Sequence, residues 1–162
     1  MFKLFVSALA LVALAGSVAG ATTEKHHITF TNHCGHGTPM LIQGPHVLSK
    51  GKPYTHRGPL ISAIAYLQTG KCGFNGDHCL TLETTLKNPN CPGCGSSTDL
   101  TLIPPHKFHV KTSFKYHHGC HTQHATCTSQ RCGTKNAFFK TDDYTAQRQC
   151  ETNNVGLEII FC

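Results

Sequence analysis

Histidine and cysteine, two side chains that bind metals, are concentrated in one short segment of this sequence. The segment is KYHHGCHTQHATC, residues 115–127. Its histidines are His117, His118, His121 and His124. A loop can fold three imidazoles around a zinc or copper ion at about 2.0–2.1 Å. These four residues are therefore a candidate metal site, and a second histidine group near the N-terminus comprises His26, His27, His33 and His36.

The histidines also have two alternative interpretations. The chain contains 13 of them, and a free imidazole gains a proton near pH 6.5. In mildly acidic surroundings they would add to a formal net charge that is already +6, which favours anionic surfaces as partners. A proteolytic cut after Lys25 would instead make His26 the N-terminal residue. An N-terminal amine, its imidazole and a second histidine form the copper brace of oxidative polysaccharide enzymes.

The state of the cysteines decides which groups remain for chemistry. A basic residue, an apolar run and small residues near position 21 predict a signal peptide over residues 1–21 and a mature domain over residues 22–162. All ten cysteines fall in the mature part, and an even number in a secreted chain predicts five disulfides. Spacing alone leaves hundreds of pairings open. The alternative is zinc bound by thiolates, because Cys91-Pro-Gly-Cys94 has the spacing of a zinc knuckle.

Several classes of function receive no support from the sequence. Oxidised cysteines leave no thiolate nucleophile. After the signal peptide, no segment is apolar for long enough to span a membrane, so we expect no membrane span. The arginines number three, at positions 57, 131 and 148, and basic residues do not alternate with aromatic ones, so we expect no binding of nucleic acid.

The elements that must position these residues are short strands. Apolar and polar residues alternate with period two over 27–31, 80–86 and 107–116, and brief apolar runs occupy 40–42, 61–67, 100–103 and 156–162. The longest alternating stretch, 107–116, predicts one strand with a dry face and a wet face. Residues 88–97 are rich in Asn, Pro and Gly and are expected to form a loop. Many short strands separated by turns predict an all-β, disulfide-rich antiparallel β-sandwich.

Four stretches of the chain resemble the thaumatin-like proteins, in particular the small secreted fungal members. They are the opening HITFTNHC (27–34), the strand containing Leu82-Glu83, the segments DLTLI (99–103) and FHV (108–110), and the C-terminal part from AFFK (137–140) to IFC (160–162). The order and spacing of these stretches carry the resemblance, which covers most of the mature chain. Full-length members have a second, helical domain, and only about twenty residues separate Cys120 from Lys140 here, so the resemblance implies a single-domain, thaumatin-like β-sandwich without that domain.

The resemblance also implies disulfide pairings and a site. The expected bridges are Cys34–Cys162, Cys72–Cys79, Cys120–Cys150, Cys127–Cys132 and Cys91–Cys94, the last without a counterpart in the family. Family members use an acidic cleft to bind or slowly hydrolyse β-1,3-glucan, and Glu83 and Asp99 occupy two of the acidic positions. Two other cleft positions differ, because Pro104-Pro105 and Tyr66-Leu67 stand where the family has an acid and an arginine.

These observations predict a secreted monomer, extracellular or in the cell wall, that binds a cell-wall polysaccharide or anionic surface and needs no cofactor. The favoured ligand is β-glucan, held by Glu83 and Asp99 without turnover. A weak endo-β-1,3-glucanase that uses the same two acids is one alternative, because hydrolysis needs two carboxyls across a sugar. A zinc- or copper-binding protein is another, and a host protein is a further candidate partner. The structural alternative makes Glu83 an exposed strand residue and Asp99 a turn residue that caps backbone N–H groups.

Overall fold

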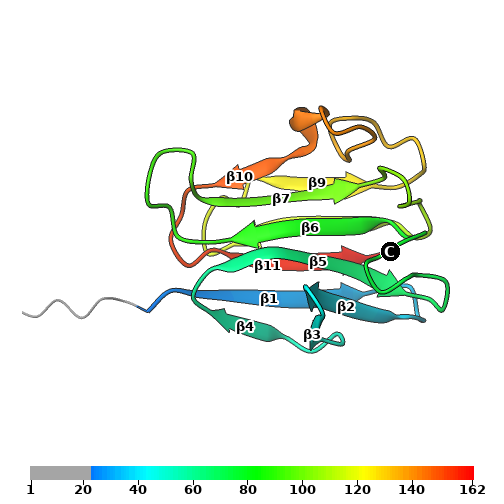
Figure 1. The fold of residues 1–162 in the computed structure, drawn as a ribbon, viewed down its shortest axis with the longest axis horizontal. Coiled ribbons are helices and arrows are strands. Elements are labelled where there is room, and N and C mark those ends of the chain that lie inside the picture. The colour runs from blue at the N-terminus through cyan, green and yellow to red at the C-terminus, as the bar shows by residue number, and fades with distance from the viewer. Residues whose placement is uncertain (1–22) are drawn as a thin grey trace, which may run out of the picture.

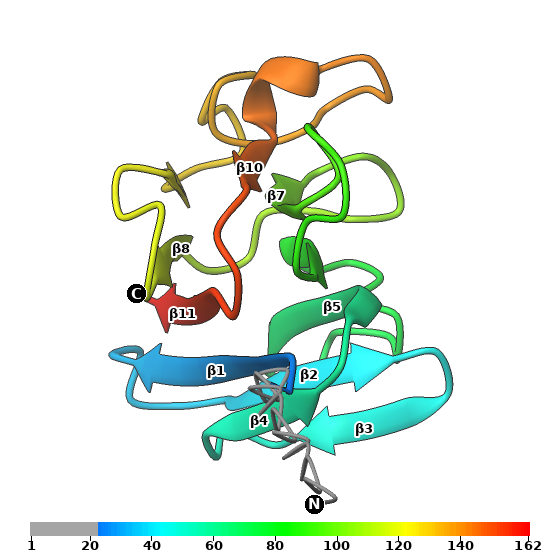
Figure 2. The same ribbon diagram turned by 90° about the vertical axis from the view of Figure 1, so that its left-hand side faces the viewer.

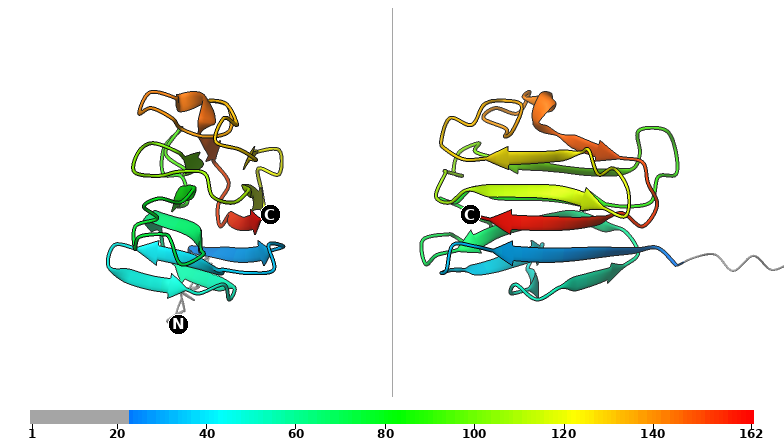
Figure 3. Two further views of the ribbon diagram at one scale, coloured as in Figure 1. Left: turned by 90° about the vertical axis from the view of Figure 1, so that its right-hand side faces the viewer. Right: turned by 180° about the vertical axis from the view of Figure 1, so that it is seen from behind.

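Two β-sheets, packed face to face, contain nearly all the regular structure of residues 23–162, the part of the chain that the computed structural model describes. The predicted signal peptide lies outside these residues. One sheet has five strands in the order β4-β1-β11-β8-β9, and the other has six in the order β10-β7-β6-β5-β2-β3. Figure 1 shows the six-stranded sheet nearer the viewer, and the right-hand view of Figure 3 shows the five-stranded sheet from behind. The prediction of an all-β, disulfide-rich sandwich is confirmed.

The strands are short, and the only helix among the described residues is a single 3-10 turn. The strand bounds are β1 Lys25–Asn32, β2 Thr38–Gln43, β3 His46–Ser49, β4 Tyr54–Arg57, β5 Leu60–Gln68, β6 Thr81–Leu86, β7 Ser96–Thr101, β8 Thr112–His117, β9 His124–Cys127, β10 Arg148–Cys150 and β11 Gly156–Phe161. The 3-10 helix η1 is Tyr144–Ala146. No helix within residues 23–162 is long and apolar enough to cross a membrane.

The first and last strands lie side by side and are parallel. β1 pairs with β11 in a register that places Ile28 opposite Leu157 and Asn32 opposite Phe161. All other strand pairs are antiparallel, so the antiparallel sandwich that the sequence predicts contains one parallel pair of named strands. A parallel pair needs a long connection between its strands, and here that connection is most of the chain.

Figure 2 shows the two sheets edge-on. Along each strand, side chains point alternately to the two faces of the sheet, and those on the inner faces form the core. On β8, Thr112, Phe114 and Tyr116 point inward and are at most 1% exposed, whereas Lys115 between them is exposed. From the six-stranded sheet, leucines such as Leu82 and Leu100 pack against them. The two outer faces therefore carry the polar side chains, and the chemistry of the molecule lies on these faces.

All five disulfides join the pairs that the resemblance implied. Cys34–Cys162 links the end of β1 to the residue after β11, with the Cα atoms 5.1 Å apart. The other four are Cys72–Cys79, Cys91–Cys94, Cys120–Cys150 and Cys127–Cys132. No cysteine is free among the described residues, so the zinc–thiolate alternative for Cys91 and Cys94 is wrong in this structure.

The predicted strand over 107–116 is half right. Only its second part forms β8, because residues 106–111 cross between the sheets. His109, expected on the wet face of that strand, is instead half-buried. Its Nδ1 accepts a hydrogen bond from the Leu80 backbone N–H at 3.0 Å, and its Nε2 donates to the Leu67 carbonyl at 3.0 Å. The two hydrogen bonds of this imidazole to the backbone hold the segment that crosses between the sheets. They outweigh the alternation of apolar and polar residues, which predicted a strand there.

The strand that carries Asp99 is longer than predicted. β7 begins at Ser96, within the segment expected to be a loop, and Ser96 and Thr98 are buried on its inner face. The Thr98 hydroxyl lies 2.7 Å from that of Thr84 and 2.9 Å from that of Tyr116. Burial of these hydroxyls is tolerated because each has a partner. Asp99 is therefore a mid-strand residue, and its interpretation as a turn residue that caps backbone N–H groups is wrong.

Candidate functional site

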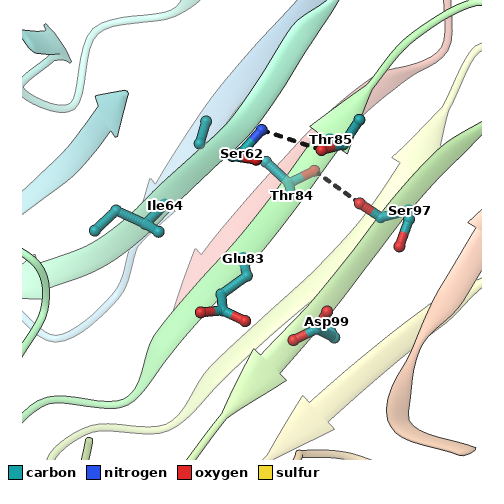
Figure 4. Close-up of a pocket in the computed structure, with 8 residues that line it drawn as sticks. Ser62, Ile64, Glu83, Thr84, Thr85, Ser97 and Asp99 are labelled. Carbon is teal, nitrogen blue, oxygen red and sulfur yellow. Dashed lines mark hydrogen bonds between the residues drawn. The ribbon is translucent and has the colours of Figure 1, made fainter. Parts of the chain in front are cut away.

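A shallow groove crosses the outer face of the six-stranded sheet, and the two predicted acids form its floor. Strand alternation points Glu83 of β6 and Asp99 of β7 to the same side, and the register places them directly opposite each other. Ile64 of β5 lies opposite Glu83 on the other side. Figure 4 shows the two carboxyl groups side by side on adjacent strands. The structure therefore brings together the two acids that the sequence singled out.

Hydroxyl groups occupy the row beside the acids. Thr85 of β6 is paired with Ser97 of β7, and both line a hollow of about 330 Å³ together with Glu83 and Asp99. Ser62 closes this row from β5, and its backbone N–H donates to the Thr85 hydroxyl at 3.0 Å. The groove thus offers hydroxyls next to carboxyls, the groups that hydrogen-bond neutral polar ligands.

A β-bulge aims Ser62 at the groove. Between Leu60 and Ala63 the pairing with β6 slips, so that β5 holds one extra residue. Ser62 has a φ of 51°, a left-handed conformation that serine seldom adopts. Bulges are common beside functional sites because they re-aim a side chain without disturbing the rest of the strand. Leu60 and Ala63 both remain buried in the core, so the bulge alters only the outer face.

One wall of the groove is the loop over 72–79, closed by the Cys72–Cys79 disulfide. The Tyr66 hydroxyl holds this loop to the outer face of β5 by donating to the Phe74 carbonyl at 2.9 Å. Asn75 from the loop and His106 line a second hollow of about 270 Å³, which shares Ser62, Ile64 and Glu83 with the first. The two adjoining hollows form one elongated depression.

The segment over 133–147 borders the other side. Phe138 bridges to Thr101 in parallel, and its N–H donates to the Leu100 carbonyl at 2.8 Å, so this segment runs along β7 beyond Asp99. Arg148 secures the segment by donating to backbone carbonyls of His124, Lys135, Thr145, Ala146 and Gln147. The planar guanidinium has five N–H donors in a fixed geometry, which lysine cannot reproduce.

The environment of Asp99 alters its acidity. Its side chain is only 8% exposed, and Oδ1 is buried without a hydrogen-bond partner among the described residues. Burial, and secondarily the charge of Glu83, raise the pKa of Asp99 from 3.8 to about 7. In mildly acidic water Asp99 therefore keeps its proton, beside the exposed Glu83. Within residues 23–162 neither acid forms an ion pair, so both can bind a ligand.

The position of the two acids suits binding better than hydrolysis. Side chains directly opposite on neighbouring strands have Cβ atoms about 4.5–5.5 Å apart. That spacing is close to the carboxyl separation of retaining glycosidases, but those carboxyls flank the scissile bond. Glu83 and Asp99 both rise from the floor of the groove, so a ligand would lie across them.

The first histidine group is spread over a hairpin. His117 ends β8, His124 begins β9, and His121 is exposed in the turn between them. His124 is paired with Lys115, and its Nδ1 donates to the Thr122 carbonyl at 3.1 Å. Among these four residues only the rings of His117 and His118 are close, with centroids 4.7 Å apart. Of the four predicted ligands, this arrangement therefore brings together His117 and His118.

The second histidine group does not gather either. His26 and His27 point to opposite faces of β1, whereas His33 and His36 lie beyond the far end of that strand. His26 is fully buried, with Nδ1 2.8 Å from the Val155 carbonyl and Nε2 3.1 Å from Glu24. A ring with partners on both nitrogens is unavailable to a metal, so His26 is a structural residue of this chain. The copper brace stays a prediction for a chain cut after Lys25, because that cut would also remove Glu24.

Within the described residues one group of three potential ligands, Cys72, Cys79 and His109, has its ligand atoms within 4.8 Å of one another. The two sulfurs form a disulfide and the imidazole holds two backbone groups, so this cluster is a structural joint.

Sequence reasoning missed the residues around the acids, namely Ser62, Thr85, Ser97, Asn75 and His106. Side chains two residues apart on a strand point to the same face of the sheet. The sequence therefore does predict that Thr85 shares a face with Glu83, and that Ser97 shares a face with Asp99. The bulge at Ser62 and the loop positions of Asn75 and His106 have no comparable signal.

No protein-family model matches the chain, and no curated protein sequence matches it.

Proposed function

We propose that this protein binds a neutral polysaccharide, with β-glucan as the favoured class, in the groove over Glu83 and Asp99. The observation that carries the proposal is the pairing of these acids in the floor of an elongated depression bordered by hydroxyls. A protonated Asp99 donates a hydrogen bond and Glu83 accepts one. A sugar hydroxyl does both, so the pair is complementary to it.

The shape of the groove supports an extended ligand. Its two hollows adjoin at Glu83 and together are comparable in size with the smaller known ligand pockets. Phe74, the residue before Asn75, is 47% exposed and offers an aromatic surface close to the second hollow. The sequence resemblance to thaumatin-like proteins, whose acidic cleft takes β-1,3-glucan, favours glucan over other neutral polymers.

Export from the cell is part of the same proposal. Five disulfides form and persist in oxidising compartments, which agrees with a secreted protein. A cell wall or extracellular matrix would supply the polysaccharide.

Co-sedimentation with insoluble β-1,3-glucan at pH 5.5 tests the proposal. We expect the wild type in the pellet, and expect Glu83→Gln and Asp99→Ala to weaken binding about tenfold or more, because the first removes a charged acceptor and the second removes the carboxyl donor. Glu158→Gln, the same change on the opposite outer face, is the matched control and should bind as the wild type does. A wild type that stays in the supernatant would refute the proposal.

Two further arms separate related activities. Release of reducing sugar from soluble β-1,3-glucan, abolished by Glu83→Gln, would show that the groove hydrolyses its ligand, contrary to the proposed binding without turnover. Binding to cationic chitosan but not to glucan would show that the acids attract charge rather than recognise hydroxyls.

A further inference from the structure

Three histidines that are far apart in the sequence meet on the outer face of the five-stranded sheet, opposite the groove. They are His27 on β1, His117 at the end of β8 and His118 directly after it. The ring centroids of His27 and His117 are 6.0 Å apart, and those of His117 and His118 are 4.7 Å apart. β11 lies between β1 and β8, as the right-hand view of Figure 3 shows, so two side chains reach over a strand to approach each other.

Gly156 makes this approach possible. It is the β11 residue paired with His117, and a Cβ built on it would collide with the atoms of the His117 ring. Its φ does not lie in the left-handed region, so the backbone alone does not require glycine there. The glycine is needed for space, because the imidazole lies over the strand where any other side chain would stand.

The partners of the rings suit metal ligation. His27 uses Nδ1 for a hydrogen bond of 3.0 Å with the Thr55 hydroxyl, which leaves Nε2 free. Metal-binding histidines commonly use their second nitrogen in this way, which fixes the ring orientation. His117 has a buried Nε2 without a partner within residues 23–162. An unpaired buried nitrogen destabilises the folded protein, and a bound ion would satisfy it.

The backbone after β8 directs the third ring. His118 has a φ of 62° and Gly119 a φ of 144°, so the chain turns sharply immediately after the strand. With Lys25, His27 and Thr55, His118 lines a hollow of about 430 Å³. A left-handed conformation at a non-glycine residue is uncommon, and such positions cluster at functional sites.

We propose that His27, His117 and His118 bind one divalent transition-metal ion, copper(II) most tightly and zinc less tightly. With nitrogen–metal distances of about 2.0–2.1 Å, two imidazoles on one ion have ring centres about 4.5–6.4 Å apart, and the observed separations fall within that range. The ring nitrogens of these three histidines do not all lie within 4.8 Å of one another, so metal binding requires the side chains to rotate. Copper(II) ranks first because, among the divalent first-row transition-metal ions, copper generally binds a given set of nitrogen ligands most tightly and zinc binds it less tightly.

The electrostatic surroundings are mixed. Burial, and then the neighbouring His118 and His27, lower the pKa of His117, which favours the neutral form of the ring over its protonated form. Lys25 lines the hollow and Lys115 is on the same face, but Lys115 is paired with Glu158 at 3.0 Å. The pKa of Glu158 is lowered, chiefly by that bond with Lys115, so a negative charge persists near His117.

Titration calorimetry of the full secreted protein with copper(II) or zinc at pH 7 tests this site. We expect one ion per chain, and expect His27→Ala, His117→Ala and His118→Ala each to weaken copper binding about tenfold or more. The double change His121→Ala with His124→Ala is the matched control. It removes two exposed histidines of the same hairpin and should leave the affinity unchanged.

Electron paramagnetic resonance of the copper complex supplies a second readout. The wild type should show coupling to several imidazole nitrogens, and His27→Ala should show one fewer. His27 is on the surface of its strand, so this variant keeps the test valid if His117→Ala fails to fold. Unchanged affinity in His27→Ala and His118→Ala, an equal loss in the control, or no binding by the wild type would each overturn the proposal. Glucan co-sedimentation should be the same with and without copper, because the groove is on the other sheet.

Discussion

Replacement of Asp99 by asparagine tests the electrostatics of the groove by way of protein stability. The carboxyl is 8% exposed, and one of its oxygens has no partner within the described residues. Asparagine has nearly the same shape and no charge at any pH. The variant therefore removes the titration of this one group and keeps the packing of β7.

The direction of the effect follows from the raised pKa. Below pH 3.8 the carboxyl is protonated in both the folded and the unfolded chain, and it adds no pH dependence. As the pH rises from 3.8 to about 7, the unfolded chain ionises and the folded chain does not, so the free energy of unfolding falls. Above about pH 7 the loss is complete.

The magnitude follows from the same two values. The difference between 3.8 and about 7, at about 1.4 kcal/mol per pKa unit, gives about 4 kcal/mol. Histidines titrate in an overlapping range, but both proteins contain them, so their contributions cancel in the difference. We expect Asp99→Asn to gain about 4 kcal/mol relative to the wild type between pH 4 and pH 8.

Thermal unfolding with intact disulfides, repeated across this pH range, measures the difference. For a chain of this length the change should appear as a relative shift in Tm of roughly 8–16 °C. Carbon-13 NMR of the Asp99 carboxyl gives its pKa directly. Glu83→Gln should lower that pKa only partly, because burial is the larger cause. A stability difference that stays constant with pH, or a carboxyl that titrates near 4, would falsify the account of the groove.

Three other changes probe the framework of the two faces. Arg148→Lys should destabilise the protein by about 2–3 kcal/mol and weaken glucan binding, because lysine cannot bond the carbonyls that hold the 133–147 segment. Amide hydrogen exchange of residues 133–147 checks this prediction, and unchanged protection of those amides in the variant would contradict it. Tyr116→Phe leaves the Arg148 carbonyl without its buried donor, so denaturant unfolding should show a loss of about 1–3 kcal/mol, and no loss would show that water replaces the hydroxyl. Gly156→Ala should displace the His117 ring and weaken copper binding, whereas glucan binding should stay as in the wild type; equal copper affinity would mean that the ring position is unimportant.

Alternation predicted the direction of side chains but not the neighbours of each strand. Leu82-Glu83-Thr84 correctly indicated that Glu83 points outward. That Glu83 lies opposite Asp99 depends on the pairing of β6 with β7, and a period-two pattern does not specify which strands pair. The sequence resemblance, rather than periodicity, suggested that these two acids belong together.

Other features were hidden because tertiary contacts outweigh local composition. Ser96-Ser97-Thr98 reads as a turn, but Thr98 is buried with two hydroxyl partners that come from β6 and β8. His46–Ser49 and Tyr54–Arg57 are short polar strands at the sheet edges, beside Gly and Pro residues that predict turns. The partners of Thr98 and the pairing of Tyr54–Arg57 with β1 are distant in the chain, whereas His46–Ser49 pairs with the preceding strand β2.

The histidines show the same limit in the functional assignment. Proximity in sequence grouped His117 with His121 and His124, whereas the fold brings His117 to His27, ninety residues away. Two facts that no local pattern contains produce this contact: β11 inserts between β1 and β8, and its residue at that level is Gly156.

The two outer faces respond to acid in complementary ways, and burial is the main cause on both. Burial raises the pKa of Asp99 to about 7 and lowers that of His117 below its usual 6.5. In both side chains burial favours the neutral form over the charged form. A neutral Asp99 can donate to a sugar, and a neutral imidazole at His117 can bind a metal. The same physical effect, removal from water, thus favours the binding form of one residue in each proposed site, and exposure of either side chain would remove that effect from its own face alone.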